Sequence, residues 1–187
     1  MPSWTNVFFV LCSVLSPALC CDWVSSRFGH LSGQSMDLIL QMGGPLTKDE
    51  CPVPFPDKLY TAICKAQVDS QLVFVRDSLK LISHLYYHDN LTAVSWDNRK
   101  LEDFRSIIHR QVEELNVCVS PGEQMDRKLR NYYRRLTQST LGRTGGSAAS
   151  WELIREVTKR HLDRLDVMMN FIKESFANRR RNTGQHH

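Results

Sequence analysis

One helical period organises residues 68–86 and constrains the fold more than any other feature of the chain. Apolar residues recur there at spacings of four, three, four, three and four: Val68, Leu72, Val75, Leu79, Ile82 and Tyr86. That spacing places all of them on one face of an α-helix. No proline interrupts the segment. The pattern therefore predicts a long amphipathic helix that turns one face to a protein core.

Further segments show the same one-sided pattern, in residues 31–42, 101–115, 125–136 and 151–176. Gly43-Gly44 is a candidate stop for the first of these segments. Candidate start residues are Ser95 or Asp97 for the second, Ser120 with Pro121 for the third, and Ser147 or Ser150 for the last. No segment alternates apolar and polar residues with the period of a strand. The sequence thus predicts an all-α fold of five helices and no sheet.

The connection between the first two helices, residues 43–66, is long and rich in proline. An up-and-down bundle needs short links throughout, whereas a connection of this length suits a bundle with a long crossover. Secreted helical cytokines have that arrangement. We therefore expect a helical cytokine bundle with about five long helices and a long first crossover, which favours a hormone-like messenger.

Residues 1–20 have the pattern of a signal peptide. Val7 to Leu15 is apolar but too short to span a membrane, and Ala18 and Cys20 are small residues before a predicted cleavage site at Cys21. These twenty residues contain no lysine or arginine, which departs from the usual positive start. We predict a secreted, extracellular protein with a single domain at 21–178 and a basic, disordered tail at 179–187.

The charge of the chain excludes some classes of partner. A formal net charge of +4 is mildly basic and does not by itself indicate nucleic acid. The stretch RNYYRRL, residues 130–136, interleaves arginine and tyrosine, but its apolar members belong to the helical stripe of residues 125–136. We interpret it as core residues with a solvated basic face. No later stretch reaches about 18 consecutive apolar residues, so we expect no membrane insertion.

The sequence carries no convincing catalytic motif. We find neither a nucleophile elbow, nor a phosphate-binding glycine loop after a strand, nor a set of metal ligands. His84 and His88 have a spacing that zinc sites use, yet Leu85 stands where a metalloprotease has its glutamate, so we expect two solvated histidines. We predict that the protein is not an enzyme and that it binds no cofactor or metal.

The last helix is more informative. Opposite its apolar stripe lies a face of alternating charge, made of Glu152, Arg155, Glu156, Lys159, Arg160, Asp163 and Arg164. Charge complementarity across such a face raises the association rate and selects the partner, which a scarce messenger requires. The plainer interpretation is a face that is only solvated.

Two kinds of modification are predicted for a secreted chain. The cysteines that follow the cleavage site can pair in three ways, and they are Cys21, Cys51, Cys64 and Cys118. Their spacing matches no zinc motif. Asn90 begins the glycosylation acceptor Asn90-Leu91-Thr92, which predicts a solvent-exposed turn and a candidate site for a sugar.

Several stretches resemble one family, the type I interferons, and specifically those of bony fish. CDWVSSRFGHLSGQSMDLILQMGG resembles their first helix with its amino-terminal cysteine, FPDKLY the crossover, VEELNVCVSP the end of the third helix, and SAASWELIREVTKRHLDRLD the final helix. The resemblance covers the whole mature chain. It implies a monomeric antiviral cytokine that bridges two class II cytokine receptor chains, activates Janus kinases and induces antiviral genes.

The resemblance also implies a disulfide pattern. The first disulfide of the family corresponds to Cys21 and Cys118. Mammalian members have a second one, from the crossover to a cysteine just before the tryptophan of the final helix, but Ala149 occupies that position here. Cys51 is then left either to pair locally with Cys64, which we favour slightly, or to remain free together with it.

For receptor contact, the family's arginines on the final helix match Arg155 and Arg160. We expect Glu156 and Lys159, which lie beside them in the sequence, to contribute to the same surface. Two alternatives stay open at this point. One is an interleukin-ten-like helical cytokine, and the other is a secreted helical carrier or membrane-active protein.

Overall fold

The computed structural model describes residues 26–87, 89–120 and 122–183, and this part of the chain holds six α-helices and no strand. The five helices expected from the sequence are α3 (Phe28–Gln41), α5 (Val68–Tyr86), α6 (Asn98–Cys118), α7 (Arg127–Thr137) and α8 (Ala148–Thr183). The predicted all-α bundle is therefore confirmed. A shorter helix, α4 (Asp57–Ile63), lies inside the crossover, where the sequence pattern predicted only a connection.

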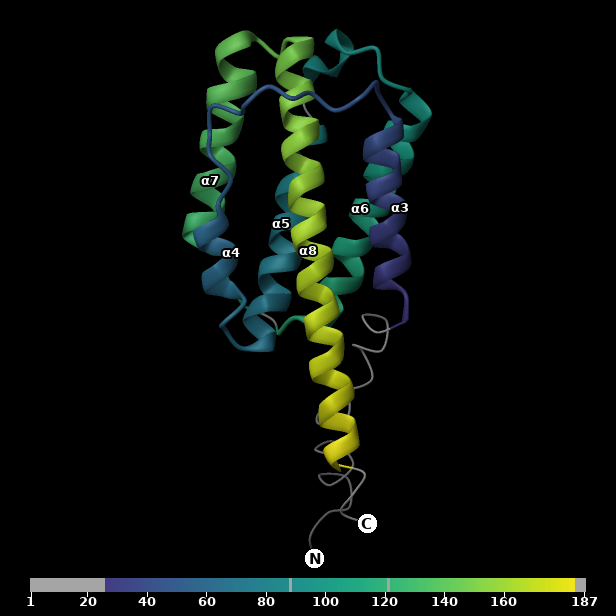
Figure 1. The fold of residues 1–187 in the computed structure, drawn as a ribbon, viewed down its shortest axis with the longest axis vertical. Coiled ribbons are helices and arrows are strands. Elements are labelled where there is room, and N and C mark those ends of the chain that lie inside the picture. The colour runs from purple at the N-terminus through teal and green to yellow at the C-terminus, as the bar shows by residue number, and fades with distance from the viewer. Residues whose placement is uncertain (1–25, 88, 121, 184–187) are drawn as a thin grey trace, which may run out of the picture.

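Two helices, α5 and α8, occupy the middle of the bundle (Figure 1). On one side α6 packs against α5 and α3, and α3 packs in turn against α8. On the other side α7 packs against α5, and α4 lies at the same side of the molecule. The crossover leaves the end of α3, passes over α8 and reaches α4 at the opposite edge (Figure 1). The path of the crossover makes it a cover for part of α8.

The predicted apolar stripes form the core. Every residue of the α5 stripe after Val68 is buried, as are Leu101, Phe104, Ile108 and Leu115 of α6. Aromatic rings fill the end of the bundle near the start of α8, where Tyr86 meets Phe104 at 5.0 Å between ring centroids and Trp96 meets Trp151 at 6.0 Å. Such edge-on contacts add about 0.5–1.5 kcal/mol per pair to the hydrophobic gain of burial.

Side-chain caps fix two helix starts as the sequence predicted. The carboxylate of Asp97, rather than Ser95, accepts hydrogen bonds from the backbone N–H groups at the start of α6, at 3.0 and 3.1 Å. The hydroxyl of Ser147 accepts from the Ser150 N–H at 3.3 Å, just before α8. Each cap satisfies donors that have no partner inside the helix.

The start of α7 differs from the prediction. The cap is Asp126, whose Oδ1 accepts from the N–H groups of Lys128 (2.6 Å) and Leu129 (3.0 Å), so the helix begins at Arg127 and not after Ser120. Pro121 lies outside the described residues. Aspartate and serine are both good N-cap residues, but the negative charge of aspartate also interacts favourably with the positive end of the helix dipole.

The helical segment that begins with α7 stops near GRTGGS, as the sequence predicted. A single π-turn, Gln138–Gly142, follows α7 directly. Gly145 and Gly146 then adopt positive φ angles of 64° and 78°, a conformation that costs little only for glycine. The GRTGGS stretch therefore acts as the predicted stop.

The last helix is longer than predicted. With 36 residues, α8 measures about 54 Å at 1.5 Å per residue and projects beyond the other helices (Figure 1). The segment 179–187, which we expected to be disordered, is helical as far as Thr183; residues 184–187 lie outside the described part. No proline or glycine precedes Gly184 in this helix, so nothing in the backbone stops it earlier.

The predicted signal peptide, residues 1–20, and Cys21 lie outside the described residues as well. Among the helices that the structure describes, none combines the length and the apolar character that a membrane span requires.

Candidate interaction surface

The outer face of α8 presents a row of paired charges. Lys159 Nζ contacts both carboxylate oxygens of Asp163, at 2.8 and 2.6 Å, and Arg160 Nε lies 3.9 Å from Glu156 Oε1. One turn on, Arg164 Nη2 reaches Asp57 Oδ1 of α4 at 3.0 Å. Partial burial raises the pKa of Glu156, while the charge of Arg160 lowers it. This face is therefore accessible, and its exposed ion pairs contribute little to stability.

The crossover forms a wall beside this row. A hollow of about 400 Å³ lies between residues 47–55 and α8, and Glu156 and Arg160 line its α8 side. The guanidinium of Arg160 lies over the ring of Phe55, 4.4 Å from the centroid. This cation–π contact orients a side chain that is still 48% exposed. Arg160 is thus held in a defined position at the edge of an open hollow.

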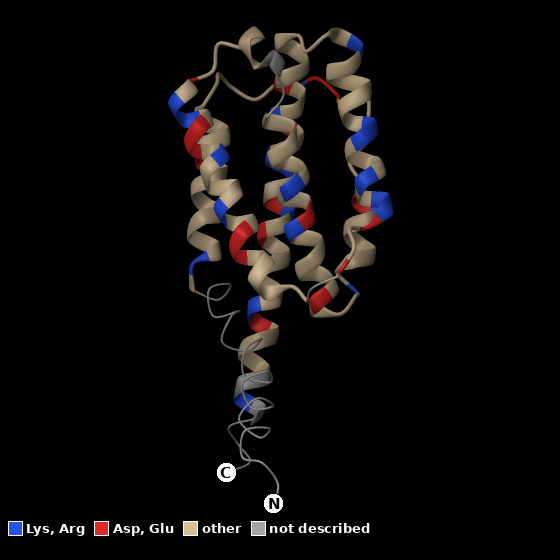
Figure 2. Ribbon diagram, turned by 180° about the vertical axis from the view of Figure 1, so that it is seen from behind, with Lys and Arg blue, Asp and Glu red and all other residues tan. Residues whose placement is uncertain are grey.

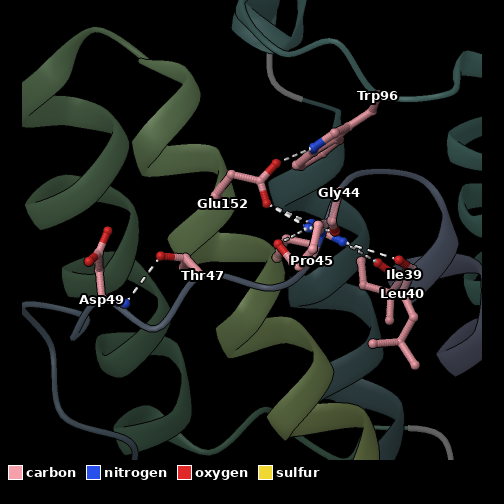
Figure 3. A network of polar contacts seen from close by, with 9 residues as sticks. Ile39, Leu40, Gly44, Pro45, Thr47, Asp49, Trp96 and Glu152 are labelled. Carbon is pink, nitrogen blue, oxygen red and sulfur yellow. Dashed lines mark hydrogen bonds and ion pairs between the residues drawn. The ribbon is translucent and has the colours of Figure 1, made fainter.

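One helical turn earlier, Arg155 has the opposite environment. Its side chain is fully buried, at 0% exposure. Nη1 donates to the carbonyls of Ile39 (3.1 Å) and Leu40 (3.4 Å), and Nη2 donates to those of Gly44 (2.6 Å) and Pro45 (3.2 Å). Figure 3 shows these carbonyls gathered from the end of α3 and the beginning of the crossover.

The charge of Arg155 is balanced by Glu152. Arg155 Nε and Nη2 lie 2.8 and 2.7 Å from Glu152 Oε2. The other oxygen, Oε1, accepts from the indole Nε1–H of Trp96 at 2.6 Å (Figure 3). We call Arg155, Glu152 and Trp96, with the four carbonyls, the Arg155 junction. It joins α3, the crossover, the segment before α6 and α8 in one polar network centred on a fully buried guanidinium.

The burial of Arg155 corrects our expectation for it. A helix ends with carbonyls that have no partner within the helix, and a cation nearby can satisfy them. Arg155 donates to two such groups at the end of α3 and to two more just beyond it, so no donor is left for an outside partner. Of the residues predicted for receptor contact, Glu156, Lys159 and Arg160 reach the surface and Arg155 does not.

Sequence reasoning missed Gly43 as part of the junction. A Cβ at this position would lie 2.8 Å from Trp96 Cδ1 and 3.2 Å from Arg155 Cζ, so only glycine lets the chain pass. At Gly44 the same Cβ meets nothing within 4 Å. The glycine pair was visible in the sequence as a helix stop, but the close approach depends on packing between distant segments.

A second buried group, His161, was also missed. Its Nδ1 is 2.7 Å from the Tyr60 hydroxyl of α4, and its Nε2 is 3.3 Å from the Tyr132 hydroxyl of α7. Complete burial, together with the smaller effect of the nearby charge of Arg160, lowers the pKa of His161 to about 3. The ring is therefore neutral at physiological pH and ties α4 and α7 to α8 directly beneath Phe55, whose ring centroid lies 4.6 Å away.

The cysteines show no local pair. Cys51 is half-buried against the core, Cys64 is exposed, and both are free thiols. The pair that we slightly favoured is therefore not formed. Burial raises the pKa of Cys51, which keeps its thiol protonated. Cys118 is the last residue of α6, and its predicted partner Cys21 lies outside the described part.

Two further predictions can be located only in part. The backbone of Asn90 belongs to a short 3₁₀ turn, Asp89–Ala93, between α5 and α6. Its side chain lies outside what the structure describes. His88, one of the two histidines considered for zinc, is outside it too; among the described residues, no three histidine, cysteine or acidic side chains gather as metal ligands would.

Comparisons with known proteins agree with this architecture. The family model of the interferon alpha/beta domain matches residues 25–172. Interferon a3 of Oncorhynchus mykiss is 41% identical over 168 residues, which are 90% of this chain and 95% of that protein. The solved structure of zebrafish interferon 1 superposes with a TM-score of 0.73 at 31% identity, over 81% of this chain and 99% of the other.

Proposed function

Because this chain belongs to the interferon alpha/beta family, and is an interferon cytokine of the bony-fish type, we propose that it is secreted and bridges two class II cytokine receptor chains on the target cell. Bridging would bring the receptor-bound Janus kinases together and induce antiviral genes. The observation that carries the proposal is the exposed charged row on α8, set beside the hollow under the crossover. We further propose that the ligand acts as a monomer, without nucleic acid, cofactor or membrane insertion, and catalyses no reaction.

One receptor chain would contact Glu156, Lys159 and Arg160 together with Arg164. Arg160 supports this role best, because it is exposed and yet oriented by Phe55, so little side-chain entropy is lost on binding. Its pair with Glu156 is long, at 3.9 Å, and leaves donors for an acidic receptor group. A charge-assisted hydrogen bond of this kind contributes about 1.5–3 kcal/mol.

Arg155 would serve the same surface indirectly. It fixes the crossover at Gly44 and Pro45, and the crossover forms the wall of the hollow that Arg160 lines. Its role in this proposal is positioning, and direct contact with the receptor is not part of it. Membership of the interferon family argues against the interleukin-ten-like alternative. No observation on the described residues favours a carrier or a membrane-active protein.

The decisive experiment reverses charge on α8. Lys159→Glu with Arg160→Glu should raise the Kd for the purified receptor ectodomains at least about tenfold, and should weaken induction of an antiviral reporter in fish cells in parallel. The matched control is Arg99→Glu with Arg110→Glu, which makes the same charge change on exposed positions of α6. Unchanged binding by the α8 variant, or an equal loss in the control, would reject the proposed surface.

Two covalent features belong to the same proposal. A Cys21–Cys118 disulfide would close a loop of about 97 residues and stabilise the fold by about 4–5 kcal/mol in the chain-entropy model. A sugar on Asn90 would lie on the turn between α5 and α6. Peptide mapping of the secreted protein by mass spectrometry tests both, since it would find the linked peptide pair and a glycosidase-sensitive mass at Asn90.

A further inference from the structure

A cluster of positive charge without any acidic residue lies on α7. Five cations and no acid occupy its eleven residues, and they are Arg127, Lys128, Arg130, Arg134 and Arg135. All five are exposed, and none takes part in the ion pairs found among the described residues. The whole chain has a net charge of only +4, so the five charges of this helix exceed the net charge of the chain. We call these five side chains the α7 basic face.

The α7 basic face does not help the helix to fold. Arg127 and Lys128 lie in the first turn, where the helix dipole disfavours positive charge. Arg127, Arg130 and Arg134 follow one another at spacings of three and four, so neighbours of like charge repel along the helix. On α8, by contrast, most exposed cations face an acidic partner. A charge pattern that opposes folding points to a role outside the fold.

The chemistry of α7 also disfavours a protein partner. Protein interfaces are centred on apolar and aromatic side chains. The apolar residues of α7 are all buried in the bundle, and they are Leu129, Tyr132, Tyr133 and Leu136. None of the large apolar side chains exposed in the described region belongs to α7. The outward face thus offers charge without an apolar anchor, which also argues against membrane insertion and base stacking.

The cations are arranged as two rows along a ridge. Arg130 and Arg134 border a hollow of about 300 Å³ between α7 and α5, while Lys128 and Arg135 border one of about 550 Å³ between α7 and α4. Figure 2 shows the helix at the right-hand edge, α7, with lysine and arginine along its length. From Arg127 to Arg134 the rows extend about 10 Å along the axis. Successive anionic groups of a chain-like ligand can therefore meet successive cations.

From this geometry we propose that the α7 basic face binds a linear sulfated polysaccharide of the cell surface or extracellular matrix. Such a polymer carries closely spaced sulfate groups and no apolar side chains, which is the complement of what α7 presents. Arginine, four of the five cations, donates paired hydrogen bonds to the oxygens of such tetrahedral anions. Binding would hold the protein near cells through a helix other than the one proposed for receptor contact.

The test uses the full mature protein and heparin as the probe. The variant Arg127→Gln with Arg130→Gln and Arg134→Gln removes three charges from one row of α7. Its matched control, Lys65→Gln with Arg99→Gln and Arg110→Gln, removes three exposed charges elsewhere. We expect the α7 variant to bind a heparin oligosaccharide at least about tenfold more weakly and with a shallower salt dependence, since fewer counterions are released. The control should change Kd less than about threefold.

Each remaining outcome bears on the proposal. Circular dichroism should show the α7 variant as helical as the parent and no less stable, because the substitutions remove repulsion. Desulfated heparin should bind neither protein appreciably. Equal loss in the control, or unchanged heparin binding by the α7 variant, would overturn the proposal. The proposal would also be overturned if the α7 variant kept its affinity for heparin but no longer bound the receptor ectodomains or phosphatidylserine vesicles. The partner of α7 would then be a protein or a membrane.

The result stands apart from the proposed receptor function. The α7 variant should bind receptor ectodomains in solution like the parent, and it should induce the antiviral reporter equally well in heparinase-treated cells. Failure of the α8 charge reversal would leave the heparin result unaffected.

Discussion

Arg155 and Arg160 lie five residues apart on α8 in opposite environments. Arg155 is fully buried and donates to four carbonyls and one carboxylate. Arg160 is about half exposed, rests on Phe55 and has one long contact with Glu156. Both arginines belong to the same charged face in the sequence pattern. The structure divides that face into a buried half that holds the fold together and an open half that is available to a partner.

Whether a helical arginine is buried or exposed depends here on the hydrogen-bond acceptors that pack opposite it. The end of α3 and the two glycines after it leave several carbonyls together, and these compensate the cost of burying a guanidinium. Around Arg160, the described residues offer the carboxylate of Glu156 and the ring of Phe55 instead of a group of carbonyls. Burial of a charge at one end of the face and exposure at the other therefore follow from what packs opposite, a property that the sequence of α8 alone does not contain.

The largest effect should come from Arg155→Ala. This change removes the donor of four carbonyls, of which that of Ile39 is buried and the others partly buried, and it leaves Glu152 with Trp96 as its remaining donor. We expect a loss of about 3–5 kcal/mol in the free energy of unfolding, because the cavity left by a fully buried side chain adds to the lost hydrogen bonds. Urea unfolding followed by circular dichroism measures it. A loss below about 1 kcal/mol would remove the contrast between the two arginines.

The second effect is a loss of stability at acidic pH, caused by the buried ring of His161. The pKa of His161 is about 3 in the folded protein and about 6.5 when unfolded. Above pH 6.5 both states are neutral there and the contribution of His161 to stability is complete. Below it the unfolded state takes up the proton first, so stability falls by up to about 1.4 kcal/mol per pH unit until about pH 3.

Urea unfolding at pH 7.5, 6.0 and 4.5 measures this loss, with His161→Asn as the control because an amide retains a polar partner for Tyr60 without titrating. The difference in pH dependence between the two proteins should reach about 2–3 kcal/mol at pH 4.5. Parallel curves for both would show that His161 is not the titrating group.

A third prediction tests how tightly the chain packs against Arg155 at Gly43. Gly43→Ala should destabilise the protein by about 1–3 kcal/mol, because the added methyl group meets the Trp96 ring and the Arg155 guanidinium. Gly44→Ala, next in the chain, should be neutral or stabilising by up to about 1 kcal/mol, since its methyl group meets nothing. Thermal unfolding of the two variants gives the comparison directly, and equal losses would contradict it.

The smallest effect on stability should come from Arg160→Ala. An exposed, long ion pair contributes little, so we expect a change within about 0.5–1 kcal/mol, including the contact with Phe55. Receptor binding by the same variant should nevertheless weaken. A large loss of stability here would mean that Arg160 acts in the fold as Arg155 does.

Much of the fold could be predicted because it depends on local periodicity. The stripes of α5, α6 and α8 face inward as predicted, and Asp97 and Ser147 cap the helices they precede. The start of α7 was misplaced because Ser120 with Pro121 has the pattern of a helix start, and only the folded chain shows that Asp126 is the cap that is used. The short α4 was missed because prolines surround it and seven residues show too little periodicity.

The candidate site was less predictable because it depends on contacts between distant segments. Lys159 and Arg160 reach the surface as expected. The burial of Arg155 and the bridge that His161 forms from Tyr60 to Tyr132 each require residues about thirty or more positions apart. No spacing rule within α8 signals either one.

The bonds from Arg155 to Gly44 and Pro45 also bear on how this protein can be made. They attach the start of the crossover to α8 by hydrogen bonds. Bonds of this type form without an oxidant and are indifferent to glutathione or dithiothreitol. These contacts with the crossover therefore need no oxidising compartment or refolding buffer to form, unlike the proposed Cys21–Cys118 disulfide.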